Sequence, residues 1–200
     1  MCIHNHKTPI HLGFTEQEVL AGTHICLIYS NEEERRDIIV KFLASAFHDH
    51  ENMVFFADRW NTDQLREQLA QEGVDVSSAE QSGQLNISDA SVAYYPNGSF
   101  NAEEMLLRLN AAYDDSIENG KKGWRGTGEM SWALNDIEGN DQLINYESGI
   151  NEEIKTRPYT VVCQYDANLF SGATLLEVLR VHPYMIARGQ VVSNPHYEAA

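Results

Sequence analysis

Basic residues are scarce in this sequence. The 14 Lys and Arg stand against 30 Asp and Glu, which gives a formal net charge of −16. Such a surface repels the phosphates of nucleic acids, so we expect no direct nucleic-acid partner. A neutralising partner surface and a salty cytoplasm fit this charge equally well, because net charge bears on solubility and association rather than on fold.

Long apolar runs and a cysteine framework are also missing. Nowhere do roughly 18 consecutive apolar residues occur, and residues 1–11 contain no long apolar stretch, so we expect neither a membrane span nor a signal peptide. The three cysteines are odd in number, and Cys26 and Cys163 lie inside apolar runs that are typical of reduced, buried thiols. These absences predict a soluble, cytoplasmic protein without disulfide bonds.

A phosphate-binding loop is missing after the first long apolar run. A nucleotide-binding α/β protein carries GxxxxGK[ST] at this junction, where backbone amides surround the phosphates. Residues 29–34 instead read YSNEEE, with no glycine, no lysine and three carboxylates where phosphate charge would lie. The junction disfavours ATP or GTP hydrolysis, so position alone does not make Glu129 a catalytic base.

What the sequence does contain is an alternation of short apolar runs and amphipathic segments. The apolar runs predict strands over residues 24–29, 53–57, 85–87, 124–129, 159–165 and 185–187. The amphipathic segments predict helices over residues 15–22, 30–47, 62–71, 101–117, 141–155 and 173–180. Continuous apolar strands separated by helices are typical of a mostly parallel sheet covered on both faces. We therefore predict a three-layer α/β fold, with residues 15–200 forming one domain after a polar, histidine-rich segment over residues 1–14.

Polar and aromatic residues gather where four of these strands are expected to end. Ligands of an open parallel sheet bind beyond the carboxyl ends of its strands. The candidate ligand contacts at these ends are Tyr29, Asp58, Trp60, Glu129, Ser131, Trp132, Gln164, Tyr165 and Asp166. Each has an ordinary structural alternative, such as capping a turn for Asp58 and Asp166 or packing for Tyr29 and Tyr165. Their shared location still predicts one pocket with carboxylates, an amide, hydroxyls and aromatic walls.

Catalysis and metal binding find little support in the pattern. Ligands of the kind that zinc prefers occur at Cys2, His4, His6, His11, His48 and His50, but their spacing matches no strong zinc motif. Cys163 lies within an apolar strand, and no GxSxG motif is present. We expect no catalytic residue, no metal ion and no cofactor.

Five segments together resemble the MEDS family, sensory domains named for methanogens, methylotrophs and the regulator DcmR. They are residues 23–29 (THICLIY), 128–134 (GEMSWAL), 163–166 (CQYD), 181–183 (VHP) and 194–197 (NPHY), in the order found in the family. The resemblance spans nearly the whole chain from about residue 22 to 197, and it adds His182 to the candidate ligand contacts. It implies a fold like that of RecA and KaiC without the phosphate-binding loop.

The resemblance also implies a function. Members of the family are expected to sense small hydrocarbon derivatives, such as halogenated or methylated compounds, and to signal to helix-turn-helix, histidine-kinase or anti-sigma modules. These 200 residues contain no such output module, so we expect a stand-alone input subunit or a domain that acts through a partner, with homo-oligomers also compatible. Two alternatives stay open: a degenerate nucleotide-binding protein or ATPase that uses Glu129, and a pure protein-interaction module.

Overall fold

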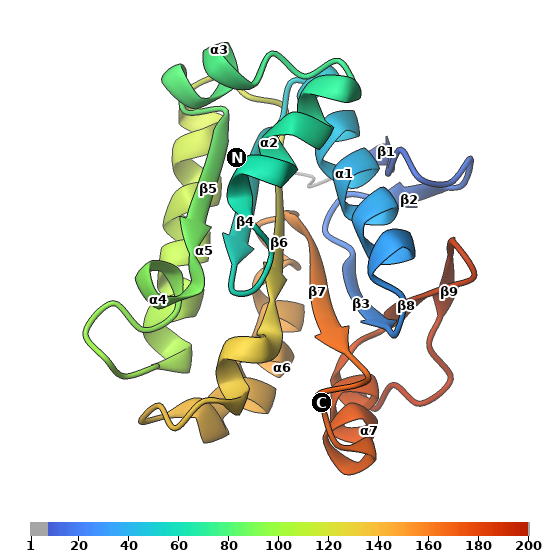
Figure 1. Ribbon diagram of the computed structural model, residues 1–200, viewed down its shortest axis with the longest axis vertical. Helices are drawn as coiled ribbons and strands as arrows, with labels where there is room; N and C mark the ends of the chain where they lie inside the picture. The colour runs from blue at the N-terminus through green and yellow to red at the C-terminus, as the bar shows by residue number, and fades with distance from the viewer. Residues whose placement is uncertain (1–7, 200) are drawn as a thin grey trace.

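A seven-stranded sheet forms the centre of the protein, which a computed structural model describes over residues 8–199 (Figure 1). The strand order is β5-β4-β6-β7-β3-β8-β9, and neighbouring strands run parallel except for the antiparallel pair β8 and β9. The strands are β3 (His24–Tyr29), β4 (Asn52–Ala57), β5 (Leu85–Asp89), β6 (Trp124–Glu129), β7 (Thr160–Asp166), β8 (Tyr184–Ala187) and β9 (Gln190–Ser193). A separate antiparallel pair joins β1 (Pro9–His11) to β2 (Glu18–Leu20).

Helices cover both faces of this sheet. One apolar cluster packs beneath α1 (Glu32–His48), α2 (Thr62–Gln71) and α3 (Val76–Gln81). A second cluster packs on the other face beneath α4 (Ala90–Ala93), α5 (Ala102–Glu118), α6 (Leu143–Glu153) and α7 (Gly172–Val181). The predicted three-layer α/β fold is therefore confirmed. Within residues 8–199, every helix is too short or too polar to cross a lipid bilayer.

The first predicted helix, over residues 15–22, is wrong. Residues 18–20 form β2, which pairs with β1, and the Thr15 hydroxyl accepts a hydrogen bond from the Gln17 amide in a tight turn rather than capping a helix. Ile10 and Leu12 are buried in the first apolar cluster, and this burial explains why the segment forms a β-hairpin instead of a helix. The described part of the predicted N-terminal segment thus packs on the domain. Its earlier residues 1–7, with Cys2, His4 and His6, lie outside the described range.

Smaller differences concern element boundaries. The cap of α1 is Asn31 rather than Ser30, because the Asn31 side chain accepts hydrogen bonds from the amides of Glu33 and Glu34. The short helices α3 and α4 and the edge strand β9 were not predicted, since runs of four to six residues carry little periodic signal.

Two glycines in β6 let aromatic rings lie against the sheet. A Cβ atom on Gly126 would fall 2.3 Å from the ring of Trp124, and one on Gly128 would fall 2.2 Å from the hydroxyl of Tyr94. Neither ring could keep its place beside a larger residue. The two glycines of the strand predicted over residues 124–129 therefore make room for the aromatic core of the second face.

Candidate functional site

Glu129 ends β6 and lies in a ring of backbone donors. Its Oε2 atom accepts hydrogen bonds from the amides of Asp58, Arg59 and Trp60 at 2.8, 2.9 and 2.9 Å. These amides follow the end of β4, the neighbouring strand. Successive N–H groups of this kind form an anion-binding nest, and here the anion is a carboxylate of the protein itself.

Arg35 reaches the same carboxylate from α1. Its Nη1 donates to Glu129 Oε1 and to Gln164 Oε1, both at 2.9 Å, and its Nη2 donates to Glu32 at 2.6 Å. The guanidinium carbon lies 4.9 Å from the centre of the Tyr29 ring and 4.5 Å from that of Trp60. The side chain is 2% exposed, so an ion pair and two aromatic faces stabilise a charge that is almost fully removed from water.

Gln164 connects this pair to the centre of the sheet. Its amide nitrogen donates to the Thr127 hydroxyl at 2.8 Å, and that hydroxyl donates to the carbonyl oxygen of Val162 at 2.7 Å. Because these three residues lie on the adjacent strands β6 and β7, the network is fixed by the sheet rather than by a loop. We call the group formed by Tyr29, Arg35, Trp60, Glu129 and Gln164 the carboxyl-edge network.

The remaining polar candidates lie at its border. The Ser131 hydroxyl donates to Asp58 at 2.5 Å, which ties the end of β6 to the loop after β4. Asp166 accepts a hydrogen bond from the amide of Asn168 at 2.8 Å, as expected of a residue that caps the turn after its strand.

Two donors in the carboxyl-edge network have no acceptor. Arg35 Nε and Trp60 Nε1 are buried and make no hydrogen bond within residues 8–199. Buried N–H groups without partners are rare in folded proteins, and each usually marks a place where water or a ligand binds. The network is thus hydrogen-bonded to the sheet through Glu129 and Gln164, whereas Arg35 Nε and Trp60 Nε1 have no acceptor within residues 8–199.

Three predicted site residues lie on the opposite face of the sheet. Trp132 is fully buried and stacks on Tyr94 with ring centres 4.8 Å apart. Tyr165 and His182 are also fully buried, and both contact Glu147 of α6. The predicted set therefore divides between two faces instead of lining one pocket, because successive residues of a strand point in opposite directions. Ligand binding by either part stays a prediction.

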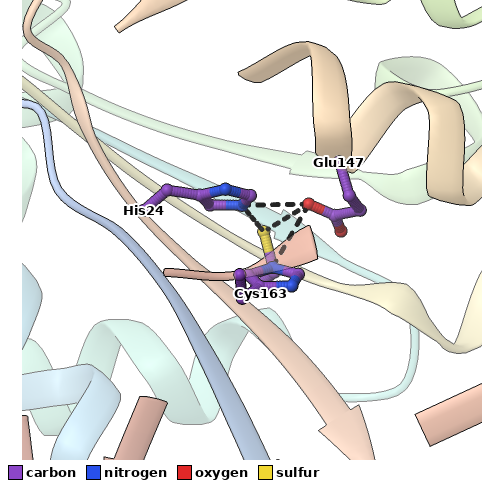
Figure 2. Close-up of side chains that lie close together, drawn as sticks. His24, Glu147 and Cys163 are labelled. Atoms are coloured by element: carbon purple, nitrogen blue, oxygen red, sulfur yellow. Dashed lines mark hydrogen bonds and ion pairs between the residues drawn. The ribbon is translucent and has the colours of Figure 1, made fainter. Parts of the chain in front are cut away.

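On that second face, four side chains with metal-ligand chemistry converge (Figure 2). His24, Glu147, Cys163 and His182 are buried, and their ligand atoms all lie within 4.8 Å of one another. His24 begins β3, Cys163 lies in β7, Glu147 lies in α6 and His182 follows α7. We call this group the His-Cys-Glu cluster.

Burial shapes the ionisation of the cluster. It lowers the pKa of His24, and the neighbouring His182 adds to this effect. Burial and then the Glu147 carboxylate raise the pKa of the Cys163 thiol. Burial alone would raise the pKa of Glu147, but His182 and His24 together outweigh it and lower that pKa. A neutral imidazole at His24 therefore faces an ionised carboxylate.

Sequence reasoning did not select Arg35, His24, Glu147 or Cys163 as site residues, although two of them carry a signal. Arg35 lies one turn from the N-terminus of α1, where the helix dipole disfavours a cation. Glu147 shares the buried stripe of α6 with Leu143, Tyr146 and Ile150, and a carboxylate within such a stripe requires a partner.

A large open cleft adjoins the carboxyl-edge network. It has a volume of about 760 Å³ and lies between α1 and α2. Its walls include Glu32, which bonds to Arg35, and Arg36, whose guanidinium lies 5.4 Å from the Trp60 ring. Most of its other charged residues are acidic, so the cleft is poorly suited to a nucleotide phosphate.

The protein is thus a three-layer α/β domain with a buried charged network at the carboxyl ends of its central strands. A solved structure with this fold is a KaiC-like protein from the hyperthermophilic archaeon Pyrococcus horikoshii. The match covers 90% of this chain and 79% of the archaeal chain, with a TM-score of 0.61 and 17% sequence identity. At this identity the likeness establishes the fold alone.

The family follows from the sequence match. The model of the MEDS family, the "MEthanogen/methylotroph, DcmR Sensory domain", matches residues 23–183, and the chain belongs to this family. A curated relative is the transcriptional repressor DcmR of Methylorubrum extorquens, 27% identical over 160 residues. That match covers 80% of this chain and 57% of the repressor, so the chain spans just over half of the relative's length. The chain thus belongs to a family of sensory domains, as the resemblance implied.

Proposed function

We propose that this domain is a non-catalytic signal-input module that binds a small molecule at the carboxyl-edge network. The observation that carries the proposal is a pair of buried donors, Arg35 Nε and Trp60 Nε1, that find no acceptor among residues 8–199. A ligand with one or two acceptor atoms would satisfy both donors, while the rings of Tyr29 and Trp60 would contact its apolar part. A methylated or halogenated hydrocarbon derivative that also carries an oxygen acceptor would have this chemistry.

The ligand would enter from the cleft between α1 and α2. Glu32 lies between that cleft and Arg35, and its side chain is half exposed. Displacement of Glu32 from Arg35 would open a path to the two donors and would free the N-terminal turn of α1. Asp58, Ser131 and Asp166 would border the bound molecule, whereas Trp132, Tyr165 and His182 lie too deep on the other face to be first choices.

The response would pass to a partner. A ligand shifts an equilibrium only if it binds one state better than another, so binding would change the position of α1 or the affinity for a partner protein or a second copy of the chain. The curated relative is a transcriptional repressor, which supports a transcription regulator in the cytoplasm as the output. A histidine kinase or an anti-sigma protein would fit the same role.

Glu129 is poorly placed to act as a catalytic base. Its Oε2 accepts hydrogen bonds from three backbone amides and its Oε1 accepts one from Arg35, so the carboxylate is already engaged in holding the end of the sheet together. This geometry argues against the degenerate ATPase.

A thermal-shift screen tests the proposal. The purified chain is heated with small halogenated and methylated compounds, with nucleotides plus Mg²⁺ in parallel wells. A compound at a hundred times its Kd should raise the melting temperature by about 5 to 10 °C, because it binds only the folded state.

Two matched tryptophan variants locate the site. Trp60→Phe removes the unpaired donor of the network and should abolish the shift, whereas Trp132→Phe removes an equally unpaired donor on the other face and should preserve it. Loss of the shift in Trp132→Phe alone would contradict the assigned site. A shift with nucleotide and Mg²⁺ only would favour the nucleotide-binding alternative, and no shift with any compound would favour a protein-interaction module.

A further inference from the structure

In both histidines of the His-Cys-Glu cluster, the ring nitrogen on the outer side, Nδ1, lies within hydrogen-bond distance of an oxygen atom. His24 Nδ1 lies 3.0 Å from Asn151 Oδ1, and the amide nitrogen of Asn151 donates to the carbonyl oxygen of Val181 at 2.7 Å. The Asn151 oxygen is therefore an acceptor, and His24 Nδ1 must carry the proton. His182 Nδ1 lies 2.7 Å from the carbonyl oxygen of Val178 and must carry a proton for the same reason.

These assignments leave the Nε2 atom of each histidine directed into the cluster. His24 Nε2 lies 3.0 Å and His182 Nε2 lies 3.4 Å from the same oxygen of Glu147. With Nδ1 protonated, Nε2 carries a proton only in an imidazolium, and otherwise it offers a lone pair that a metal ion can accept. His182 Nε2 makes no hydrogen bond within residues 8–199, although it is fully buried. Two imidazole nitrogens, a carboxylate oxygen and a thiol sulfur thus meet at one buried point.

The distances within the cluster suit a tetrahedral ion. Nitrogen, oxygen and sulfur ligands of tetrahedral zinc lie about 3.3 to 3.7 Å from one another, given bonds of about 2.0 to 2.3 Å. The Cys163 sulfur lies 3.3 Å from Glu147 Oε2 and 3.6 Å from His24 Nε2, and the His182 to Glu147 distance is 3.4 Å. Three of these edges match, and the 3.0 Å edge between His24 and Glu147 is slightly short.

The surroundings also have the form of a metal site. Histidine ligands usually donate their second N–H group to a carbonyl or carboxamide oxygen, which fixes the ring and its tautomer. Both histidines do so here, and the hydroxyl of Tyr165 holds the second oxygen of Glu147 at 2.5 Å. All four candidate ligands belong to the protein, as in structural rather than catalytic zinc sites.

We propose that His24, Glu147, Cys163 and His182 bind one divalent transition-metal ion, with Zn²⁺ favoured by the two imidazoles, the thiolate and the carboxylate. On binding, the Cys163 thiol releases its proton to solvent and its sulfur forms a bond to the ion. The ion joins α6 and the α7–β8 junction to the central strands β3 and β7. Because the ligand side chains are buried, the ion enters during folding or a transient opening.

Cobalt is the probe that identifies the ligands. The full-length chain is unfolded, freed of metal by chelation and refolded with Co²⁺. The wild type should bind one ion per chain through this cluster and give the visible bands of tetrahedral Co²⁺ with a near-ultraviolet thiolate-to-cobalt charge-transfer band. The three cysteines supply matched variants. Cys163→Ser should lose the charge-transfer band, whereas Cys26→Ser, on the adjacent strand, and Cys2→Ser should keep it.

A second measurement does not depend on whether Cys163→Ser folds. X-ray absorption at the zinc edge of the refolded wild type should find one sulfur and three nitrogen or oxygen neighbours, and the same shell should persist in Cys2→Ser and Cys26→Ser. Asn151→Ala should weaken metal affinity about 10- to 100-fold, since it releases the ring of His24. Failure of the folded wild type to retain stoichiometric Zn²⁺ or Co²⁺ overturns the proposal, as does a charge-transfer band that survives in Cys163→Ser.

Discussion

Two buried arginines lie at opposite edges of the same sheet and are satisfied to different degrees. At the amino edge, every nitrogen of Arg125 has an acceptor. Its Nε donates to Glu51, its Nη2 to Asp49, and its Nη1 to the Ser45 hydroxyl and the carbonyl oxygen of His11. These bonds join β6 to α1 and to the N-terminal hairpin. They leave no nitrogen of Arg125 available to a ligand.

At the carboxyl edge, Arg35 is equally buried but incompletely satisfied. It is fixed by Glu129 and Gln164, yet its Nε has no acceptor within residues 8–199. The comparison teaches that burial of a charge does not by itself distinguish a structural residue from a binding residue. Within residues 8–199, Arg35 differs from Arg125 in its Nε, because an unsatisfied buried donor costs free energy that a ligand or water would recover.

The largest expected loss of stability follows substitution of Arg125, at the amino edge of the sheet. Arg125→Met leaves the Glu51 carboxylate buried without its partner, so the free energy of unfolding should fall by about 3 to 5 kcal/mol. Urea denaturation followed by circular dichroism measures it. Adding Glu51→Gln should restore part of the loss, since the uncompensated charge is then gone. A loss below about 1 kcal/mol for the single variant would contradict the structural role of Arg125.

Arg35→Met should cost less. Glu129 keeps its three backbone donors when the guanidinium is removed, so the free energy of unfolding should fall by about 1.5 to 3 kcal/mol. The same variant should lose any small-molecule thermal shift, which Arg125→Met would retain if it stays folded. Arg36→Met, on the more exposed neighbouring residue, is the matched control for stability. If Arg35→Met still showed the small-molecule thermal shift, Arg35 would not be a binding residue, and the proposed difference between Arg35 and Arg125 would be wrong.

Gln164→Leu tests the link between Arg35 and the sheet. It removes an acceptor of Arg35 and the donor to Thr127, but the Thr127 hydroxyl keeps its bond to Val162. We expect a loss of about 1 to 2 kcal/mol in urea unfolding. If the loss exceeded that of Arg35→Met, the glutamine rather than the ion pair would be the centre of the network.

The smallest effect is expected for an exposed arginine. Arg180 is 49% exposed and pairs with Glu177 and Glu198 on the surface. Arg180→Ala should change the free energy of unfolding by less than about 0.5 kcal/mol, and added salt should reduce even that difference. A larger change would mean that the Arg180 ion pairs contribute more to the stability of the domain than their exposure indicates.

The order of helices and strands was largely readable from the sequence. Apolar runs such as residues 24–29 and 160–165 are too short for helices and too continuous for exposed strands, so they predict a buried parallel sheet. The segment after Tyr29 also showed by itself that no phosphate-binding loop follows β3. The rule that ligands bind at strand ends selected four of the five members of the carboxyl-edge network, Tyr29, Trp60, Glu129 and Gln164.

Which face each side chain points to, and what it meets there, only the tertiary structure decided. Gln164 and Tyr165 are neighbours in sequence, but one contacts Arg35 and the other contacts Glu147 on opposite faces of the sheet. His24 and Cys163 are 139 positions apart and meet because β3 and β7 pair in parallel. Local sequence sets the type of each element through propensity and periodicity. The partners of buried polar groups depend on strand order and helix placement, which emerge only when the whole core packs.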